Sequence, residues 1–346
     1  MASSISRWLG IAAGVSATAI AGAIAYGRYG TPQELPLPAA VDGERRVITR
    51  RAGPLSYYVA GSGQPLLLIH SVNAAASAYE VGPLFEALKA DRRVYAVDLP
   101  GFGFSDRSDR PYRLALYIAA IHDMLDEIAA DAGPGAIDAL ALSLSGEFLG
   151  RVAAERPEAF RTVALVTPTG FEHGANARRG PNGKTREVPG LHGVLSVPVW
   201  SRGLYSLLVT RPSIRFFLEK TFASKLIDEG LLEYDYLTTH QPGAEHAPYA
   251  FVSGRLFSSD IRTVYERLTP PVLLLHGTRG DFQDFSEAGW IESRSNWRRV
   301  FLNTGALPHF ERLSEVLGHY RAFLEAPSPR ALADQSSSSP SRSPSP

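Results

Sequence analysis

One serine of this sequence, Ser143, could be the nucleophile of an acyl-bond hydrolysis, provided that the fold supplies a base and an acid beside it. Ser143 lies in the run Ala139-Leu-Ala-Leu-Ser-Leu-Ser-Gly146, between an apolar stretch and a segment with a helical pattern. A serine hydroxyl is a good nucleophile only when a base removes its proton and hydrogen-bond donors receive the oxyanion. The chain must therefore fold so that a histidine and a carboxylate reach this serine.

Short apolar runs that alternate with helical patterns are the elements that could position these residues. Runs of this length, bounded by Gly, Pro or Asp, are typical of strands buried on both faces. Strands that alternate with helices predict a parallel sheet covered on both sides, which is an α/β fold. A leading antiparallel pair is expected within residues 47–60. The other expected strands are residues 66–69, 94–97, 137–142, 163–166, 272–275 and 300–302.

The alternation of strands and helices stops between about residues 171 and 262. This block begins with a polar, Gly-rich loop and continues with helical stretches. A helical block inserted between strands predicts a cap above the carboxyl ends of the sheet, where open α/β sheets bind ligands. Its apolar residues could line an acyl pocket or could simply pack the cap. They include Trp200, Leu204, Leu207, Phe216 and Phe217.

Four motifs resemble those of the α/β-hydrolase family, and the resemblance covers residues 46–325. They are Asp98-Leu-Pro-Gly-Phe-Gly-Phe-Ser105, the serine run with Arg151-Val-Ala-Ala-Glu-Arg-Pro157 after it, His276-Gly-Thr-Arg-Gly-Asp281, and Gly305-Ala-Leu-Pro-His-Phe-Glu311. The resemblance implies a mostly parallel eight-stranded sheet with helices on both faces and an inserted helical cap. It also implies the order nucleophile, acid and base, here Ser143, Asp281 and His309. The implied oxyanion donors are the backbone amides of Val72 and Leu144.

The serine and acid motifs depart from the family's pattern. Ala141 and Ser145 replace the two glycines of Gly-x-Ser-x-Gly, although both are small enough for a tight turn. Asp281 comes one residue later after the strand glycine than in the family, and Asp284 is a second candidate for the acid. A loop aspartate can also serve only as a turn former.

The base and oxyanion motifs depart further. Ala306 stands where the family usually has its catalytic histidine. His309 therefore either replaces the missing base or has a structural role at the start of a helix. Ser71 replaces the glycine of the family's His-Gly pair, which restricts the backbone there. Asn73 could add a side-chain donor to the oxyanion hole or could cap the following helix.

Two functions follow from these residues. The first is a serine hydrolase that cleaves a carboxylic ester or related acyl compound through an acyl-enzyme. Its substrates could include lipid-like esters. The alternative is a non-catalytic binding or scaffold protein that keeps the fold with a degenerate triad. A serine at position 143 argues against the branches of the family that use an aspartate nucleophile.

Composition excludes several other classes of function. The chain contains no cysteine, so thiol catalysis, disulfides and thiolate metal sites are excluded. Lys+Arg and Asp+Glu both number 35, which gives no field that would favour nucleic acid. No dinucleotide motif and no metal-ligand spacing of histidines is present, so we expect neither a cofactor nor a metal.

The two ends of the chain have compositions unlike the body. Residues 8–26 are 19 residues without a charged side chain, close to the length that crosses a bilayer. Residues 1–29 are thus expected to be a membrane anchor. The alternatives are a cleaved signal segment, which would make the protein secreted or periplasmic, and a soluble extension. Residues 30–45 are expected to form a Pro-containing linker, and the Ser/Pro-rich residues 326–346 a disordered tail.

Overall fold

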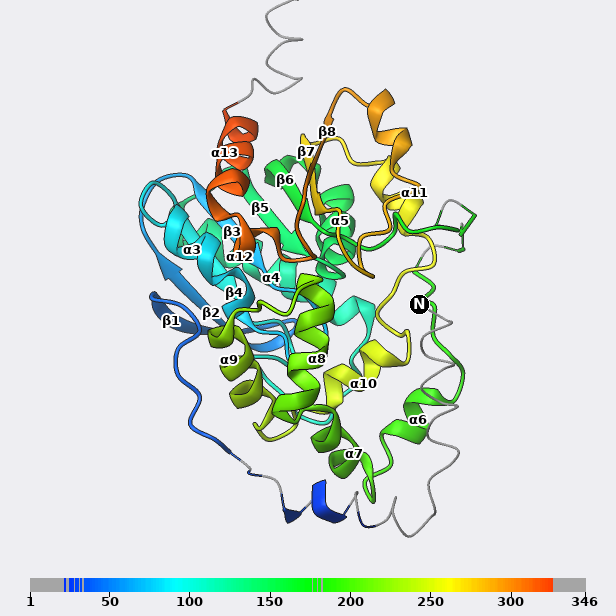
Figure 1. Cartoon of the computed structure of the whole chain (residues 1–346). Helices are drawn as coiled ribbons and strands as arrows, with labels where there is room; N and C mark the ends of the chain where they lie inside the picture. Colours follow the sequence, from blue (N-terminus) through cyan, green and yellow to red (C-terminus); the bar gives the residue numbers. More distant parts are fainter. Residues whose placement is uncertain are drawn as a thin grey trace, which may run out of the picture.

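The computed structural model describes residues 22, 25–27, 29–30, 32, 34–175, 177–178, 180–181 and 183–325. A mostly parallel eight-stranded sheet lies at its centre, in the order β1-β2-β4-β3-β5-β6-β7-β8 (Figure 1). The pairs β1·β2 and β2·β4 are antiparallel and all other neighbours are parallel. The predicted α/β fold is confirmed. The strands are β1 (Glu44–Arg50), β2 (Gly53–Ala60), β3 (Pro65–Ile69), β4 (Arg93–Val97), β5 (Ile137–Leu142), β6 (Phe160–Val166), β7 (Val272–Gly277) and β8 (Trp297–Leu302).

Apolar side chains bury both faces of this sheet. In β3, Leu67 and Ile69 join the core beneath α4, α5 and α11, whereas Leu66 and Leu68 join the core beneath α3 and α13. Side chains alternate between the faces of a strand, so a continuous apolar run is the pattern that this double burial requires. These helices are α3 (Gly82–Leu88), α4 (Leu114–Ala132), α5 (Ser145–Glu155), α11 (Ile261–Glu266) and α13 (Leu313–Leu324). The described residues also form the short 3₁₀ helices η1 (Ala78–Val81), η2 (Pro157–Ala159) and η3 (Gly289–Ser293).

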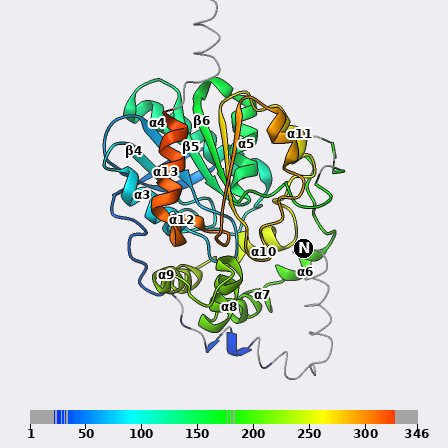
Figure 2. The ribbon, with the colours of Figure 1, turned by 45° about the horizontal axis from the view of Figure 1, so that its top comes forward.

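Five of the six described helices between β6 and β7 form a cap over one end of the sheet (Figures 1 and 2). Tyr205 of the cap donates a hydrogen bond to the carbonyl of Ala74, in the loop that follows β3. Arg107, in the loop after β4, donates to the carbonyl and the hydroxyl of Thr238 near the end of a cap helix. These contacts hold the cap against the carboxyl ends of the strands. The cap helices are α6 (Leu191–Leu195), α7 (Ser201–Leu208), α8 (Arg211–Phe222), α9 (Glu229–Thr239) and α10 (His246–Val252).

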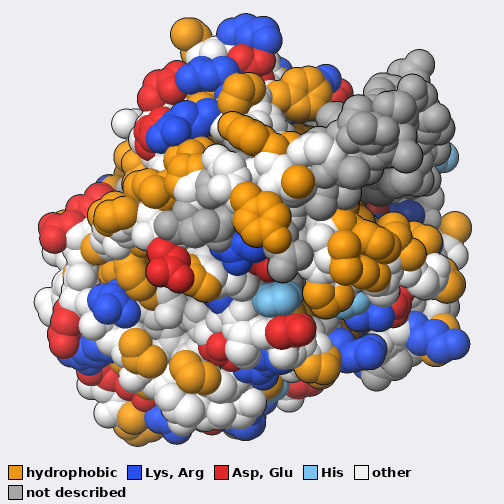
Figure 3. All heavy atoms as spheres, turned by 90° about the horizontal axis from the view of Figure 1, so that it is seen from below, with side chains coloured by type: hydrophobic (Ala, Val, Ile, Leu, Met, Phe, Trp, Pro, Cys, Tyr) orange, Lys and Arg blue, Asp and Glu red, His pale blue; other side chains and the backbone are white. Residues whose placement is uncertain are grey.

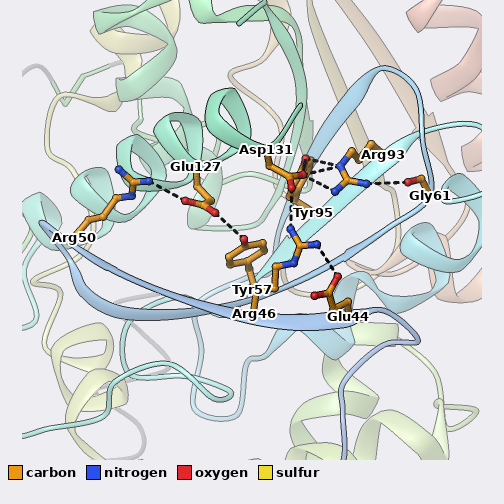
Figure 4. Close-up of polar contacts among 9 residues, drawn as sticks. All are labelled: Glu44, Arg46, Arg50, Tyr57, Gly61, Arg93, Tyr95, Glu127 and Asp131. Atoms are coloured by element: carbon orange, nitrogen blue, oxygen red, sulfur yellow. Dashed lines mark hydrogen bonds and ion pairs between the residues drawn. The ribbon is translucent and has the colours of Figure 1, made fainter. Parts of the chain in front are cut away.

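A charged network fastens the β1–β2 hairpin to the carboxyl end of α4 (Figure 4). Asp131 of α4 pairs with Arg46 of β1 and with Arg93 of β4, and it also accepts from the Tyr95 hydroxyl. Burial of Asp131 opposes ionisation, but these three donors outweigh it and lower the pKa of Asp131 to about 2. The network lies at the edge of the sheet away from the cap, and its role is to hold the hairpin.

The described residues near the N-terminus pack against the cap. The amide of Glu34 donates to the carbonyl of His240, and Gln241 donates to the carbonyl of Leu35. In the described part of the chain, no helix has the length and apolar character needed to span a bilayer. Most of the anchor expected in residues 1–29 lies outside the described residues, as does the tail expected in residues 326–346.

Candidate active site

Ser143 occupies a strained turn between a buried strand and a helix. It follows the end of β5 and precedes α5, and its φ of 50° lies in the left-handed region that favours glycine. Its amide donates to the carbonyl of Val166 at 2.9 Å, which fixes the turn against the neighbouring strand β6. A left-handed residue other than glycine costs about 1–2 kcal/mol, so the surrounding structure must impose this conformation. The turn leaves the Ser143 side chain partly exposed at the carboxyl end of the sheet.

The two expected oxyanion donors flank this turn. Ile69 of β3 and Ala141 of β5 are paired neighbours in the sheet. Val72 comes three residues after Ile69, and Leu144 comes three residues after Ala141. Both residues are buried. Within the described residues, neither backbone amide has a hydrogen-bond acceptor. Buried amides without acceptors are rare in native proteins, so this pair is suited to receive an oxygen from a ligand.

Glu80 organises the loop that carries the Val72 amide. Its buried carboxylate accepts from the amide of Ser71 at 2.7 Å, from the Ser71 hydroxyl at 3.0 Å and from the Asn73 side-chain amide at 2.8 Å. The other end of the Asn73 side chain accepts from the amide of Ala75 at 2.6 Å. Asn73 therefore stabilises its own loop, and both of its amide protons point to Ser71 and Glu80 rather than to an oxyanion.

His309 lies at the start of the short helix α12 (Pro308–Glu311) and is fully buried. Its Nε2 donates to the backbone carbonyl of Glu80 at 2.7 Å, while Nδ1 has no hydrogen-bond partner. Burial lowers the pKa of His309 to about 4, although the contact with the Glu80 carbonyl partly opposes that shift. The imidazole is therefore neutral near pH 7. No hydrogen bond joins His309 to Ser143 in the described structure.

The two candidate acids also have other partners. The Asp281 side chain is 67% exposed and pairs with Lys220 of α8 at 3.0 Å. Asp284 accepts from the amide of His173 at 2.8 Å and from the Ser286 hydroxyl at 2.7 Å, which is the behaviour of a turn former. The described structure thus places neither aspartate in contact with His309. The assignment of Asp281 as the acid and His309 as the base stays a prediction.

The carboxyl end of α8 covers both of the loops where an acid and a base are expected. The amide of Ala306 donates to the carbonyl of Thr221 at 2.7 Å. A Cβ at Gly305 would lie 2.4 Å from that same carbonyl oxygen, and a Cβ at Gly280 would lie 2.7 Å from the Cβ of Ala223. The small residues at positions 280, 305 and 306 therefore allow the last turn of α8 to sit directly on these loops.

Sequence reasoning missed Glu80 as a member of this site. Residue 80 belongs to no recognised motif, and its partner His309 is 229 residues away in the sequence. The available signal was a single glutamate within an otherwise apolar and small-residue stretch, residues 74–85. A buried carboxylate needs several hydrogen bonds, and the loop of residues 71–73 provides them.

Comparison with known proteins agrees with this fold. A family model described as the alpha/beta hydrolase family matches residues 66–329. An enol-lactonase from Burkholderia xenovorans LB400 is 18% identical with a TM-score of 0.63, over 81% of this chain and 100% of that chain. A serine hydrolase involved in carbazole degradation is 17% identical with a TM-score of 0.62, and the match covers 82% of this chain and 98% of the hydrolase. A bacterial membrane phospholipase A is 22% identical with a TM-score of 0.56, and the match covers 93% of this chain and 96% of the phospholipase.

No curated protein matches the chain. At these identities the solved structures establish a shared fold, while their substrates belong to those proteins. The family model spans well over half of the sequence, from β3 past the end of α13. This protein therefore belongs to the α/β-hydrolase family.

Proposed function

We propose that this protein is a serine hydrolase that cleaves a carboxylic ester or a related acyl compound through an acyl-enzyme on Ser143. The observation that carries the proposal is the strained turn at Ser143, flanked by two buried amides without acceptors. A strained serine beside unpaired amides is what acyl transfer requires, because the nucleophile and the oxyanion donors must be preorganised together.

In this mechanism the Ser143 oxygen attacks the carbonyl carbon of the substrate, and the resulting oxyanion accepts from the amides of Val72 and Leu144. His309 takes the proton of Ser143 and returns it to the leaving alcohol. Water then releases the acid from the serine. Asp281 is the proposed partner that orients His309.

Assembly of this triad requires a rearrangement of the contacts described above. His309 must give up one hydrogen bond to the Glu80 carbonyl, a loss of about 1 kcal/mol. Asp281 must leave Lys220, and an exposed ion pair of this kind is weak. Because the last turn of α8 rests on both loops, we propose that α8 has to move before the triad forms.

A second function is favoured by the same contacts. If α8 never lifts, Ser143 has no base, and the protein is a non-catalytic binding protein of the α/β-hydrolase fold. The observation in its favour is that Ala306 and Gly280 sit directly beneath the last turn of α8, with no space for larger side chains at position 280.

We also propose that the protein is attached to a membrane through its N-terminal segment and acts on lipid-like esters. Residues 8–26 are uncharged, and several apolar side chains of the cap are exposed. A lipid-like substrate is consistent with both features.

A fluorophosphonate probe separates hydrolase from binding protein, since it reacts only with an activated serine. Labelling of the full chain that Ser143→Ala abolishes is the result we expect. A fully folded wild-type protein that stays unlabelled in the presence of membranes, with and without added ester, would favour the binding protein. If labelling persists in His309→Ala, the serine is active but the base is another group.

A further inference from the structure

The N-terminal segment meets the body of the protein at the cap. Gly27 lies against α7 so closely that a Cβ on it would be 2.3 Å from the carbonyl oxygen of Gly203. Tyr26 and Tyr29, on either side of this contact, are 63% and 81% exposed. The uncharged residues 8–26 end directly before Gly27, which contacts the cap, so no spacer separates this segment from α7.

The cap presents an apolar surface beside this contact, formed by residues 194–200. Val194 and Val199 are 59% and 67% exposed, and the Trp200 indole donates to the carbonyl of Val194 at 2.8 Å. Residues 188–201 include no Asp, Glu, Lys or Arg. Figure 3, which views this end of the molecule, shows hydrophobic side chains gathered on it between groups of charged ones. Exposed apolar patches of this kind mark interaction sites.

We propose that the apolar cap surface of residues 194–200 rests on a lipid bilayer. The inference rests on the proposed membrane attachment, but it does not depend on catalysis by Ser143. If residues 8–26 cross a bilayer, the contact between Gly27 and Gly203 holds α7 at the level of the lipid headgroups. Uncharged residues then face the acyl boundary, and Trp200, Tyr26 and Tyr29 take the interfacial position that aromatic residues favour.

A bilayer explains this surface better than a second copy of the chain does. The apolar cap surface directly precedes α7, whose Gly203 contacts Gly27, and Gly27 follows the predicted membrane segment in the sequence. The two features therefore adjoin. The carboxyl ends of the strands lie on the same side of the sheet as the cap (Figures 1 and 2). The proposal therefore also turns the end of the sheet at which Ser143 lies toward the lipid.

Tryptophan fluorescence tests this orientation in the full chain. The protein has four tryptophans, at positions 8, 200, 290 and 297. Trp290 and Trp297 pack with Phe171 in the core near β8, and Trp8 can be removed by Trp8→Phe. The Trp8→Phe protein is bound to phosphatidylcholine vesicles with and without brominated acyl chains, and binding is checked by flotation. We expect quenching by the brominated lipid that disappears in Trp8→Phe/Trp200→Phe.

A charge placed on the apolar cap surface provides the second measurement. Val194→Asp should reduce the quenching of Trp200 by about twofold, because a carboxylate does not enter the acyl boundary. Val47→Asp is the matched control, since Val47 of β1 is 56% exposed at the far edge of the sheet.

Three results would overturn the inference. Protein that floats with unquenched Trp200 is anchored with the cap turned away from the lipid. Protein that does not float at all lacks the anchor. Val194→Asp that converts a dimer into a monomer, without changing quenching, would assign this surface to a second copy. Labelling of Ser143 is independent of all three, so failure here and failure of the hydrolase proposal are distinguishable.

Discussion

Removal of the Glu80 carboxylate is the perturbation that tests the site most directly. In Glu80→Ala, the buried amide and hydroxyl of Ser71 and the half-buried side-chain amide of Asn73 lose their acceptor. Each unsatisfied buried donor costs about 1–3 kcal/mol, so we expect a loss of about 3 kcal/mol of unfolding free energy. For a body of this size that corresponds to a decrease in Tm of roughly 6–12 °C.

The loop of residues 71–73 also carries the Val72 amide, so the same change should slow the reaction of Ser143. Loss of one oxyanion donor reduces rate by about 10²–10³. We expect fluorophosphonate labelling of Glu80→Ala to be slowed by at least about tenfold, at a temperature where the variant is folded. Glu80→Gln keeps one acceptor oxygen and should recover part of the rate.

Glu147→Ala is the matched control for this experiment. Glu147 is equally buried, and its carboxylate accepts from the amide of Ser258 at 2.7 Å and from the Thr169 hydroxyl at 2.5 Å. It should lose a similar amount of stability with little effect on labelling. Equal labelling rates for folded Glu80→Ala and wild type would refute the role of Glu80. Equal slowing in both variants would show that lost stability alone explains the effect.

Three further predictions address the cap, the strained turn at Ser143 and the charged network. The double variant Thr221→Cys/Ala306→Cys, in a chain that has no other cysteine, should form a disulfide on oxidation that ties α8 to the loop of Ala306. Labelling of Ser143 should then be lost on oxidation and return on reduction, with each single variant as control. Undiminished labelling of the oxidised form would mean that α8 need not move. Ser143→Gly should be more stable than Ser143→Ala by roughly 1 kcal/mol in thermal unfolding, because only glycine adopts a φ of 50° without strain; the reverse order would contradict the strained turn. Asp131→Asn should lose about 2 kcal/mol at pH 7, since the pKa of Asp131 falls from 3.8 to about 2 on folding. A carboxyl with a lowered pKa stabilises the fold above its unfolded pKa, so in wild type this contribution is lost as the pH falls from about 4 to about 2, and acid titration of Asp131→Asn should lack that step.

The sheet could be predicted because its signal is local. Runs such as residues 66–69 and 137–142 are uninterrupted apolar segments, and each is a buried strand in the structure. The turn at Ser143 was also predictable, because small residues flank the serine between a strand and a helix. In both cases the signal lies in neighbouring residues, although the surrounding structure imposes the left-handed φ of Ser143 itself.

The surroundings of Ser143 could not be predicted from the sequence, because the decisive contacts join distant segments. The sequence indicates that Ala306 replaces the usual histidine, but it does not reveal that Thr221 of the cap occupies the adjacent space. It also does not reveal that the carbonyl of Glu80 holds His309. Such contacts depend on how the cap and the loops pack, and no periodicity or motif encodes that packing.

The two outer strands of the sheet have a consequence for the behaviour of the protein at high local density. β1 and β8 each leave one row of backbone groups unpaired, and such edges can template aggregation. Arg45, Arg46 and Arg50 lie on β1, and Arg298 and Arg299 lie on β8. Edge-to-edge association would bring like charges together, so copies crowded on one surface should resist intermolecular strand pairing. Neutralising Arg45 and Arg298, which lie outside the network that holds the hairpin, should therefore promote fibre-like assembly before it affects folding.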